Sequence, residues 1–373
     1  MGKYHSEHIN IYGAKSYINT LVKFIGEHLN RKSKTGIRHS ESRERMFAPT
    51  QKSTTVVDVT YFCNATCIYC QWGNPDNPLR KPLPLQEILL SAETIKALGT
   101  ERIVLSGGEP RLHPQLLEVL SHYRRLVNEV VIMTNGYGLD RQEVSRLTEH
   151  GATGVTVSLD STLPGQSMLT RETSSDIHRQ IVFNLKDICE HPREFELGIN
   201  SVVSHVTANW KTVRKVLEFG QMLGVDFVKF QPIFNDGYVE LNATHLMLSP
   251  SDSPQLLDIG RRLSTIEHPK TNPSGFWKNI ADLAAGKELS SKSCGLGPWH
   301  SIAVRNNLSV CYWLGNVSFG NTSFKLENES ALVIKRSFEV AKLKCKVGFH
   351  CFCTQDLSHI WENQKIEKEE KLG

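Results

Sequence analysis

Three cysteines stand within eight residues of each other, at Cys63, Cys67 and Cys70 in the stretch YFCNATCIYC. Thiolates at this spacing are ligands for soft metals, and the nearest further candidates, such as His113 or Cys189, are far along the chain. A structural zinc site takes four protein ligands, whereas an iron–sulfur cluster held by three cysteines leaves one iron open to an outside ligand. The spacing is therefore compatible with a zinc site completed from elsewhere or with a cluster that binds a further molecule.

The composition is typical of an enzyme in a reducing compartment. With 373 residues the chain can bury a large core and carry a smaller appendage. Nine cysteines are too few for a disulfide-stapled secreted domain, and the N-terminal MGKYHSEHINIYG has no apolar segment of the signal-peptide type. No apolar run approaches the ~18 residues of a membrane span. We therefore expect a cytoplasmic protein with no membrane partner, whose clustered thiols bind metal.

The overall charge does not select a partner. The 43 basic and 39 acidic side chains leave a net charge of +4, which is too small to require nucleic acid. A basic stretch at 31–45 lacks the interleaved aromatic residues of a base-stacking surface. We interpret it as a solvated linker and do not expect nucleic acid as a partner.

Six short β-branched runs alternate with helical patterns in the first two thirds of the chain. Near-continuous apolar strands separated by helices are typical of parallel β/α units. Six units are fewer than the eight of a closed barrel, so they predict an α/β fold that is either a partial (β/α)6 barrel or an open doubly wound sheet. The runs lie at 54–62, 102–107, 129–136, 154–160, 197–204 and 226–233.

The candidate chemistry lies where these strands end. The three-cysteine stretch follows the first strand directly, and SGGEP ends the second, at the edge where parallel β/α folds build their active sites. Glycines allow close backbone approach, and a carboxylate such as Glu109 can pair with an ammonium group. Such a pair at ~4 Å is worth about 4 kcal/mol at an effective dielectric constant near 20. Polar residues also follow the later strands, at Asn135, Ser158, Asp160, Asn200, Ser201 and Gln231.

Other patterns divide the chain into segments. Apolar residues at helical spacing in 14–30 predict a helix, so residues 1–50 would form an N-terminal helix and a basic linker. The β/α region spans 51–245, a small cysteine-rich α+β domain spans 246–360, and a charged tail at 361–373 is expected to fray. The cysteine-rich part contains Cys294, Cys311, Cys345, Cys351 and Cys353, and its sequence predicts a hairpin around residues 302–313.

Together these motifs resemble the radical S-adenosylmethionine (radical SAM) superfamily. Its signature is the C-x3-C-x2-C spacing after the first strand, with an aromatic residue, here Tyr69, before the third cysteine, and a glycine–glycine–glutamate turn after the second strand. The resemblance implies a partial (β/α)6 TIM-like barrel whose [4Fe-4S] cluster is held by Cys63, Cys67 and Cys70 and binds SAM at its open iron. It also implies that SAM is contacted by Tyr69, Gly107, Gly108, Glu109, Asn135, Ser158, Asp160, Asn200 and Gln231.

The resemblance also implies a reaction. In this family a reduced cluster cleaves SAM, and the 5′-deoxyadenosyl radical abstracts hydrogen from an unactivated carbon, so the cofactor supplies the difficult chemistry. No side chain need act as a general acid or base, and we expect no catalytic residue besides the cofactor. The implied partners are a one-electron reductant, flavodoxin- or ferredoxin-like, and a peptide or small-molecule substrate, with a peptide slightly favoured.

The C-terminal cysteines resemble, more loosely, the SPASM and twitch extensions that hold auxiliary iron–sulfur clusters. Asn306 stands where the family hairpin has glycine, and five thiols cannot fill two four-ligand clusters. The resemblance therefore implies one auxiliary [4Fe-4S] cluster, held by Cys294, Cys311 and two of Cys345, Cys351 and Cys353. Four thiolates would also suit structural zinc.

Two other functions stay open from the sequence. One is a zinc-stapled binding module without catalysis, and the other is a radical SAM enzyme that modifies RNA through the basic stretch. A conventional methyltransferase is disfavoured because no glycine-rich G-x-G turn follows the first strand. Cys189, alone on a helical stretch, is predicted to be a small core residue.

Overall fold

The computed structural model describes residues 54–97, 99–233, 241–272, 274–287, 301–304, 307–309 and 323–325. The predicted N-terminal helix, the basic linker, the charged tail and the five C-terminal cysteines lie outside the described residues. The described strands form one sheet in the order β10-β9-β8-β1-β2-β3-β4-β5-β6-β7. Strands β1 to β7 are parallel neighbours, which confirms the predicted α/β fold.

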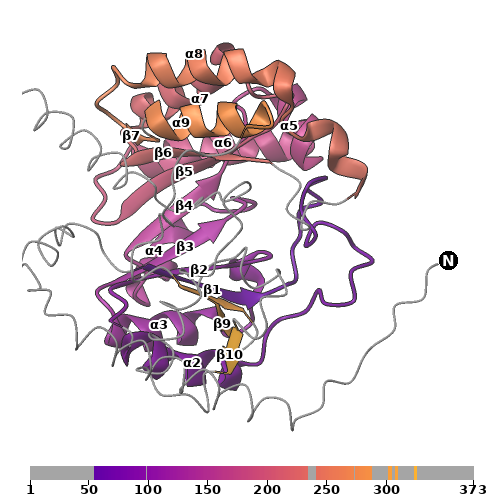
Figure 1. Cartoon of the computed structure of the whole chain (residues 1–373). Coiled ribbons are helices and arrows are strands. Elements are labelled where there is room, and N and C mark those ends of the chain that lie inside the picture. The colour runs from indigo at the N-terminus through magenta and orange to yellow at the C-terminus, as the bar shows by residue number, and fades with distance from the viewer. Residues whose placement is uncertain are drawn as a thin grey trace, which may run out of the picture. The chain divides into compact units, whose positions relative to one another are not determined.

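All six predicted strands are present, with helices between them (Figure 1). In chain order the elements of this region are β1 Thr54–Thr60, α2 Leu85–Ala97, β2 Arg102–Gly107, η2 Pro110–Leu112, α3 Leu116–Leu126, β3 Glu129–Thr134, α4 Arg141–Glu149, β4 Gly154–Ser158, α5 Pro164–Arg171, α6 Ser175–Cys189, β5 Glu196–Val203, α7 Trp210–Leu223 and β6 Phe227–Pro232. They are followed by η3 Leu241–Leu246, η4 Pro250–Asp252, α8 Ser253–Leu263, β7 Lys270–Thr271, α9 Ser274–Ala284, β8 Ser301–Val304, β9 Asn307–Ser309 and β10 Ser323–Lys325.

Helices α4, α6 and α7 begin at a residue whose side chain caps the helix. Asp140 accepts a hydrogen bond from the backbone N–H of Glu143 at the start of α4, and Asn209 accepts one from Thr212 at the start of α7. Helix α7 ends at Gly224, whose left-handed backbone (φ 63°) stops the helix before β6. Helix α4 leads directly into β4 and helix α7 into β6, so the connections to these parallel strands are short.

The apolar core lies between the strands and the helices. Successive side chains of a strand point to opposite faces of the sheet. The apolar side chains on one face of β1, such as Val57 and Val59, belong to one large buried cluster with side chains of the helices. Figure 1 shows α2 and α3 beside the β1–β3 end of the sheet and α7, α8 and α9 beside the β5–β7 end. Trp277 of α9 is fully buried with its ring 5.4 Å from that of Phe230 on β6.

The sheet curves so strongly that its inner side chains meet across three strands. Arg102 on β2 pairs with Glu129 on the neighbouring β3 at 2.8 Å and also with Glu196 on β5. In a flat sheet β2 and β5 would stand roughly 14 Å apart, at about 4.8 Å per strand. The Arg102–Glu196 ion pair closes this distance over the inner face, which favours the concave sheet of the partial barrel over the open doubly wound sheet.

The inner face of the barrel is polar and partly reached by solvent, unlike the packed interior of a closed eight-stranded barrel. Along each strand, the inner-face residues alternate with residues that are fully buried in the core. Register pairing places Asp58 beside Ser106 and aligns Ser158, Asn200 and Lys229 across β4, β5 and β6. The partly exposed inner residues include Asp58, Val104, Ser106, Met133, Ser158, Asn200, Val202, Lys229 and Gln231.

Strands beyond β7 extend the sheet on its other edge. Strand β8 pairs in parallel with β1, and β8 and β9 are antiparallel, as expected for the predicted hairpin. Strand β10 pairs antiparallel with β9. Among the described helices, none combines the length and the apolar character that a membrane crossing requires.

Candidate active site

The three cysteines lie on a loop that leaves the carboxyl end of β1. Cys63 is buried, Cys67 and Cys70 are half-buried, and all three are free thiols. The backbone N–H of Cys70 donates to the carbonyl of Cys67 at 3.0 Å, and that of Gly73 donates to Cys70 at 2.8 Å. The rings of Tyr61 and Trp72 stack at 4.1 Å, which joins the two ends of the loop. The loop is thus a compact turn that holds three thiols at the barrel rim.

Burial and one cation set the electrostatics of the thiols. Burial raises the pKa of Cys63 and Cys70, and it raises that of Cys67 to about 12. The positive charge of Arg171 opposes this rise at all three sulfurs. The site therefore disfavours free thiolates unless further positive charge is present, which is what a bound metal or iron–sulfur cluster supplies.

This donor set fits an iron–sulfur cluster. Among the described residues, no three His, Cys, Asp or Glu side chains converge on a point that one metal ion could occupy. A cubane cluster needs no such convergence, because each thiolate binds a different iron at a separate corner. Three soft sulfur donors on one compact loop match that requirement.

The glycine turn after β2 packs directly on the cysteine loop. The N–H of Gly108 donates to Thr60 at 2.7 Å, and that of Glu109 donates to Phe62 at 2.8 Å. A Cβ on Gly107 would lie 2.1 Å from the carbonyl oxygen of Thr60, and one on Gly108 would lie 2.2 Å from that of Phe62. The two glycines are required by close backbone approach, as expected, and the approach is to the residues that lead into Cys63.

Glu109 joins the turn to the end of β3. Its Oε1 accepts hydrogen bonds from Arg111 N at 3.1 Å and Thr134 Oγ1 at 2.9 Å, and its Oε2 accepts one from Asn135 N at 2.7 Å. The side chain is 2 % exposed, and burial raises its pKa. A carboxylate can accept about four hydrogen bonds. Three are used by the chain, so Oε2 keeps room for one more donor.

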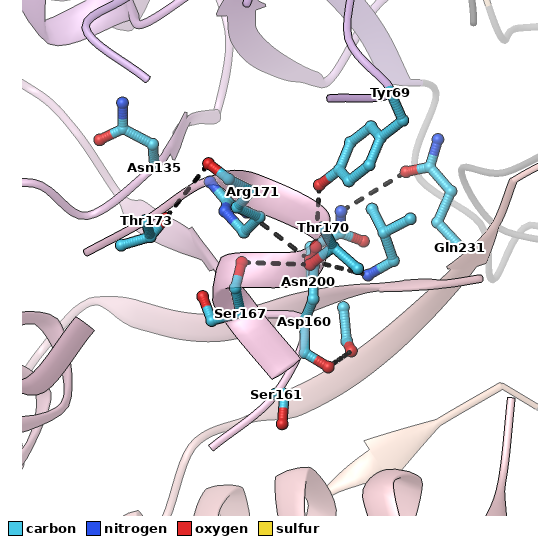
Figure 2. Close-up of polar contacts among 12 residues, drawn as sticks. Tyr69, Asn135, Asp160, Ser161, Ser167, Thr170, Arg171, Thr173, Asn200 and Gln231 are labelled. Carbon is cyan, nitrogen blue, oxygen red and sulfur yellow. Dashed lines mark hydrogen bonds and ion pairs between the residues drawn. The ribbon is translucent and has the colours of Figure 1, made fainter. Parts of the chain in front are cut away.

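Asp160, after β4, connects three elements around the cysteine loop (Figure 2). Its Oδ2 accepts a hydrogen bond from the Tyr69 hydroxyl at 2.9 Å, and its Oδ1 lies 3.6 Å from Nη1 of Arg171 and accepts from Val202 N at 3.1 Å. Both Asp160 and Arg171 are nearly fully buried. This buried pair fixes Tyr69 and places a cation close to the thiols.

The other residues expected from the sequence divide between the rim and the inner face. Figure 2 shows Asn200 and Gln231 pointing toward one another from neighbouring strands, with Asn200 Nδ2 donating to Gln231 Oε1 at 3.4 Å. Ser158 lies in register with Asn200 on the partly exposed inner face. Asn135 is buried at the rim, where its Nδ2 lies 3.8 Å from the sulfur of Cys63. Ser201 donates to the carbonyl oxygen of Asp160 at 3.3 Å.

Three residues of the site carry no strong sequence signal. Arg171 ends α5 and is placed by the fold beside the cysteine loop, where Thr170 also accepts a hydrogen bond from Ile68 N at 3.1 Å. Thr134 supplies one of the donors to Glu109. Asp58 lies on the inner face. It is a charged residue within the β-branched run TTVVDVTYF, and this is the sequence signal that could have identified it.

Comparison with known proteins gives a family match and several relatives. Residues 57–222 match the family model described as the radical SAM superfamily. The chain is 26% identical over 298 residues to molybdenum cofactor biosynthesis protein 1 of Homo sapiens, which covers 74% of this chain and 43% of that protein. It is 36% identical over 118 residues to a GTP 3′,8-cyclase of Photorhabdus laumondii, covering 30% and 34%. The matches thus span less than half the length of these relatives.

Solved structures share the fold at low sequence identity. The native anSMEcpe structure with bound AdoMet matches with a TM-score of 0.55 at 16% identity, over 84% of this chain and 95% of that one. SuiB of Streptococcus suis, bound to the precursor peptide SuiA, matches with a TM-score of 0.58 at 13% identity, over 87% and 78%. At these identities the comparison shows the fold alone.

Proposed function

We propose that this chain, whose residues 57–222 belong to the radical SAM superfamily, cleaves SAM reductively at a [4Fe-4S] cluster bound by Cys63, Cys67 and Cys70 and abstracts hydrogen from a polar substrate. One observation carries the proposal: the cysteine loop, the glycine turn and the Asp160–Arg171 pair contact one another at the carboxyl ends of the strands. When bound, the cluster and SAM supply the one-electron chemistry. The chain itself binds, orients and excludes water.

SAM would be held by charges that the rim already provides. The remaining acceptor site of Glu109 Oε2 suits the ammonium group of SAM, and the buried guanidinium of Arg171 suits its carboxylate. Asp160 is largely occupied by Tyr69, Arg171 and Val202, so we assign it to support these residues. Asn200 and Gln231 offer amide groups on the inner face for the nucleoside.

The substrate would bind on the inner face of the barrel. This face is polar and partly exposed, whereas the outer alternates of the same strands are buried in the core. Lys229 on β6 gives it a positive charge, and Asp58 on β1, at the other end of the six-stranded array, gives it a carboxyl group whose pKa is raised to about 7 by burial. Such a surface suits a polar molecule or a peptide segment better than an apolar one.

The comparisons favour a small molecule as the first substrate to test. Relatives named GTP 3′,8-cyclase match part of this chain, so GTP is the first probe. A peptide is the second candidate, because the fold resembles that of SuiB, which is bound to a precursor peptide. A one-electron reductant of flavodoxin or ferredoxin type would support either reaction.

The test is anaerobic incubation of the iron-loaded protein with SAM and dithionite, followed by measurement of 5′-deoxyadenosine. We expect a brown protein that forms 5′-deoxyadenosine, and faster formation with GTP than with a cysteine-containing peptide of matched concentration. Faster formation with the peptide would move the substrate to the second class. A colourless, zinc-loaded protein that leaves SAM intact would refute the proposal and favour the binding module.

We further propose an auxiliary [4Fe-4S] cluster on the C-terminal cysteines. Replacing Cys294 or Cys311 with alanine is expected to lower iron content by about one cluster while retaining part of the SAM cleavage, because the loop on β1 keeps its own thiols. Iron analysis together with 5′-deoxyadenosine measurement checks this. Cys189→Ala is the control, since Cys189 packs on the apolar core. Unchanged iron with one equivalent of zinc would identify the site as structural zinc.

A further inference from the structure

Asn135 is held in one orientation by hydrogen bonds on three sides. Its backbone N–H donates to Glu109 Oε2 at 2.7 Å, and its Oδ1 accepts from Tyr137 N at 2.9 Å. Its Nδ2 donates to Asn64 Oδ1 at 2.7 Å. The side chain is 6 % exposed. With its amide oxygen and one amide hydrogen engaged, the direction of the second amide hydrogen is fixed.

That second hydrogen points to the sulfur of Cys63. Nδ2 of Asn135 lies 3.8 Å from Sγ of Cys63, within hydrogen-bonding reach of a sulfur acceptor, and the backbone N–H of Ala65 donates to the same sulfur at 3.4 Å. An amide nitrogen carries two donors, so the bonds to Asn64 and to Cys63 can coexist. Cys63 therefore receives one donor from the backbone and one from a side chain that can be substituted.

Donors to a ligand sulfur stabilise negative charge on it. The Asn135 amide and the backbone N–H of Ala65 both donate toward the sulfur of Cys63, so both favour negative charge there. The same interaction favours the reduced form of a cluster bound through that sulfur, because reduction adds one electron to the iron–sulfur unit. The site is buried, so the effect is stronger than it would be in water.

We propose that Asn135 is a positioning residue that raises the reduction potential of the cluster through the sulfur of Cys63, and that it is not a direct ligand of SAM. The inference rests on the proposed function, since it takes a cluster on Cys63 as given. It differs from the expectation based on sequence, which grouped Asn135 with the residues that contact SAM.

The test is a redox titration of the full-length, iron-loaded protein. It is monitored by the EPR signal of the reduced cluster that changes when SAM is added. Asn135→Leu keeps the approximate size of the side chain and removes both amide donors. In this variant we expect the ratio of reduced to oxidised cluster at a fixed potential to fall about tenfold. For a one-electron couple this equals a shift of the cluster's reduction potential by about 59 mV to more negative values. Asn64→Ala is the matched control, because it removes one partner of Asn135, while the hydrogen bond from Tyr137 N to Asn135 Oδ1 still orients the amide toward Cys63. Its potential should stay near that of the wild type.

Asn135→Ala provides a second variant if the leucine is not accommodated. An unchanged potential in either variant at full iron content would overturn the inference, as would weaker SAM binding at an unchanged potential. Loss of iron from both variants would also overturn it, because Asn135 would then be needed for assembly rather than for tuning. Absence of a cluster from the wild-type loop would instead refute the proposed function itself, so the two failures can be told apart.

Discussion

Replacing Cys63, Cys67 or Cys70 with alanine is expected to abolish the formation of 5′-deoxyadenosine from SAM under reducing conditions. The proposed cluster is held by these three thiols, and a two-thiol loop leaves a second iron without a protein ligand. We expect a loss of at least about 1,000-fold, which corresponds to about 4 kcal/mol of activation free energy. Anaerobic assay of 5′-deoxyadenosine, together with iron analysis, measures it.

Cys189→Ala is the matched control for this experiment. Cys189 is also a half-buried free thiol, but it ends α6 and packs against the core between sheet and helices. It should lose some packing and keep SAM cleavage near the wild-type rate. If any of the three loop variants retained wild-type cleavage, that cysteine would not be a cluster ligand, and the site would have to be reassigned.

The sequence was sufficient to predict the parallel β/α arrangement because its signals are local. Six β-branched runs coincide with β1 to β6, and the helical patterns between them fall on helices such as α3 and α7. Periodicity reports only which residues of one element are buried. It could not choose between a partial barrel and an open sheet, because that choice depends on curvature. The Arg102–Glu196 pair, which joins β2 to β5 across β3 and β4, favours the curved sheet.

The glycine turn shows how far a motif can be interpreted. The sequence indicated that Gly107 and Gly108 allow close backbone approach, and they do so against Thr60 and Phe62. It did not indicate that Glu109 would accept three hydrogen bonds from Arg111, Thr134 and Asn135. These donors come from two different strand ends, and no pattern within one segment encodes their meeting.

Arg171 was not predictable for the same reason. It stands at the end of α5, in a stretch without a motif, and its importance comes from a buried ion pair with Asp160 and from its charge near Cys67. Asp160 was expected to contact SAM from its place after the fourth strand. The structure shows that this carboxylate also organises Tyr69, Arg171 and the backbone of β5.

Asp58→Asn is expected to stabilise the protein at alkaline pH and to have little effect in acid. Asp58 lies on the inner face of β1. Among the residues that the structure describes, none donates a hydrogen bond to its carboxylate. Burial raises its pKa from 3.8 to about 7. The folded protein therefore holds a proton on Asp58 in a range of pH where the unfolded chain has released it.

The sign of the effect follows from this difference. Between about pH 4 and pH 7 the folded state binds more protons than the unfolded state, so the free energy of unfolding falls as the pH rises and levels off above about 7. A difference of about three units, at 1.36 kcal/mol each, gives up to about 4 kcal/mol. Asparagine resembles the protonated acid in shape and carries no charge. The variant should avoid this loss.

The measurement is the difference in free energy of unfolding between Asp58→Asn and wild type, determined by denaturant titration from pH 5 to pH 8.5 at equal iron content. Taking the difference cancels the titration of all other groups, and the gain of the variant should grow with pH by up to about 4 kcal/mol. Asp76→Asn is the control, because Asp76 is exposed and its carboxylate is hydrated in both states. A pH-independent difference for Asp58→Asn would mean that the carboxylate is ionised in the folded protein and is stabilised there by a partner. The inner face would then carry a fixed negative charge at neutral pH, and this charge would oppose the binding of an anionic substrate such as GTP.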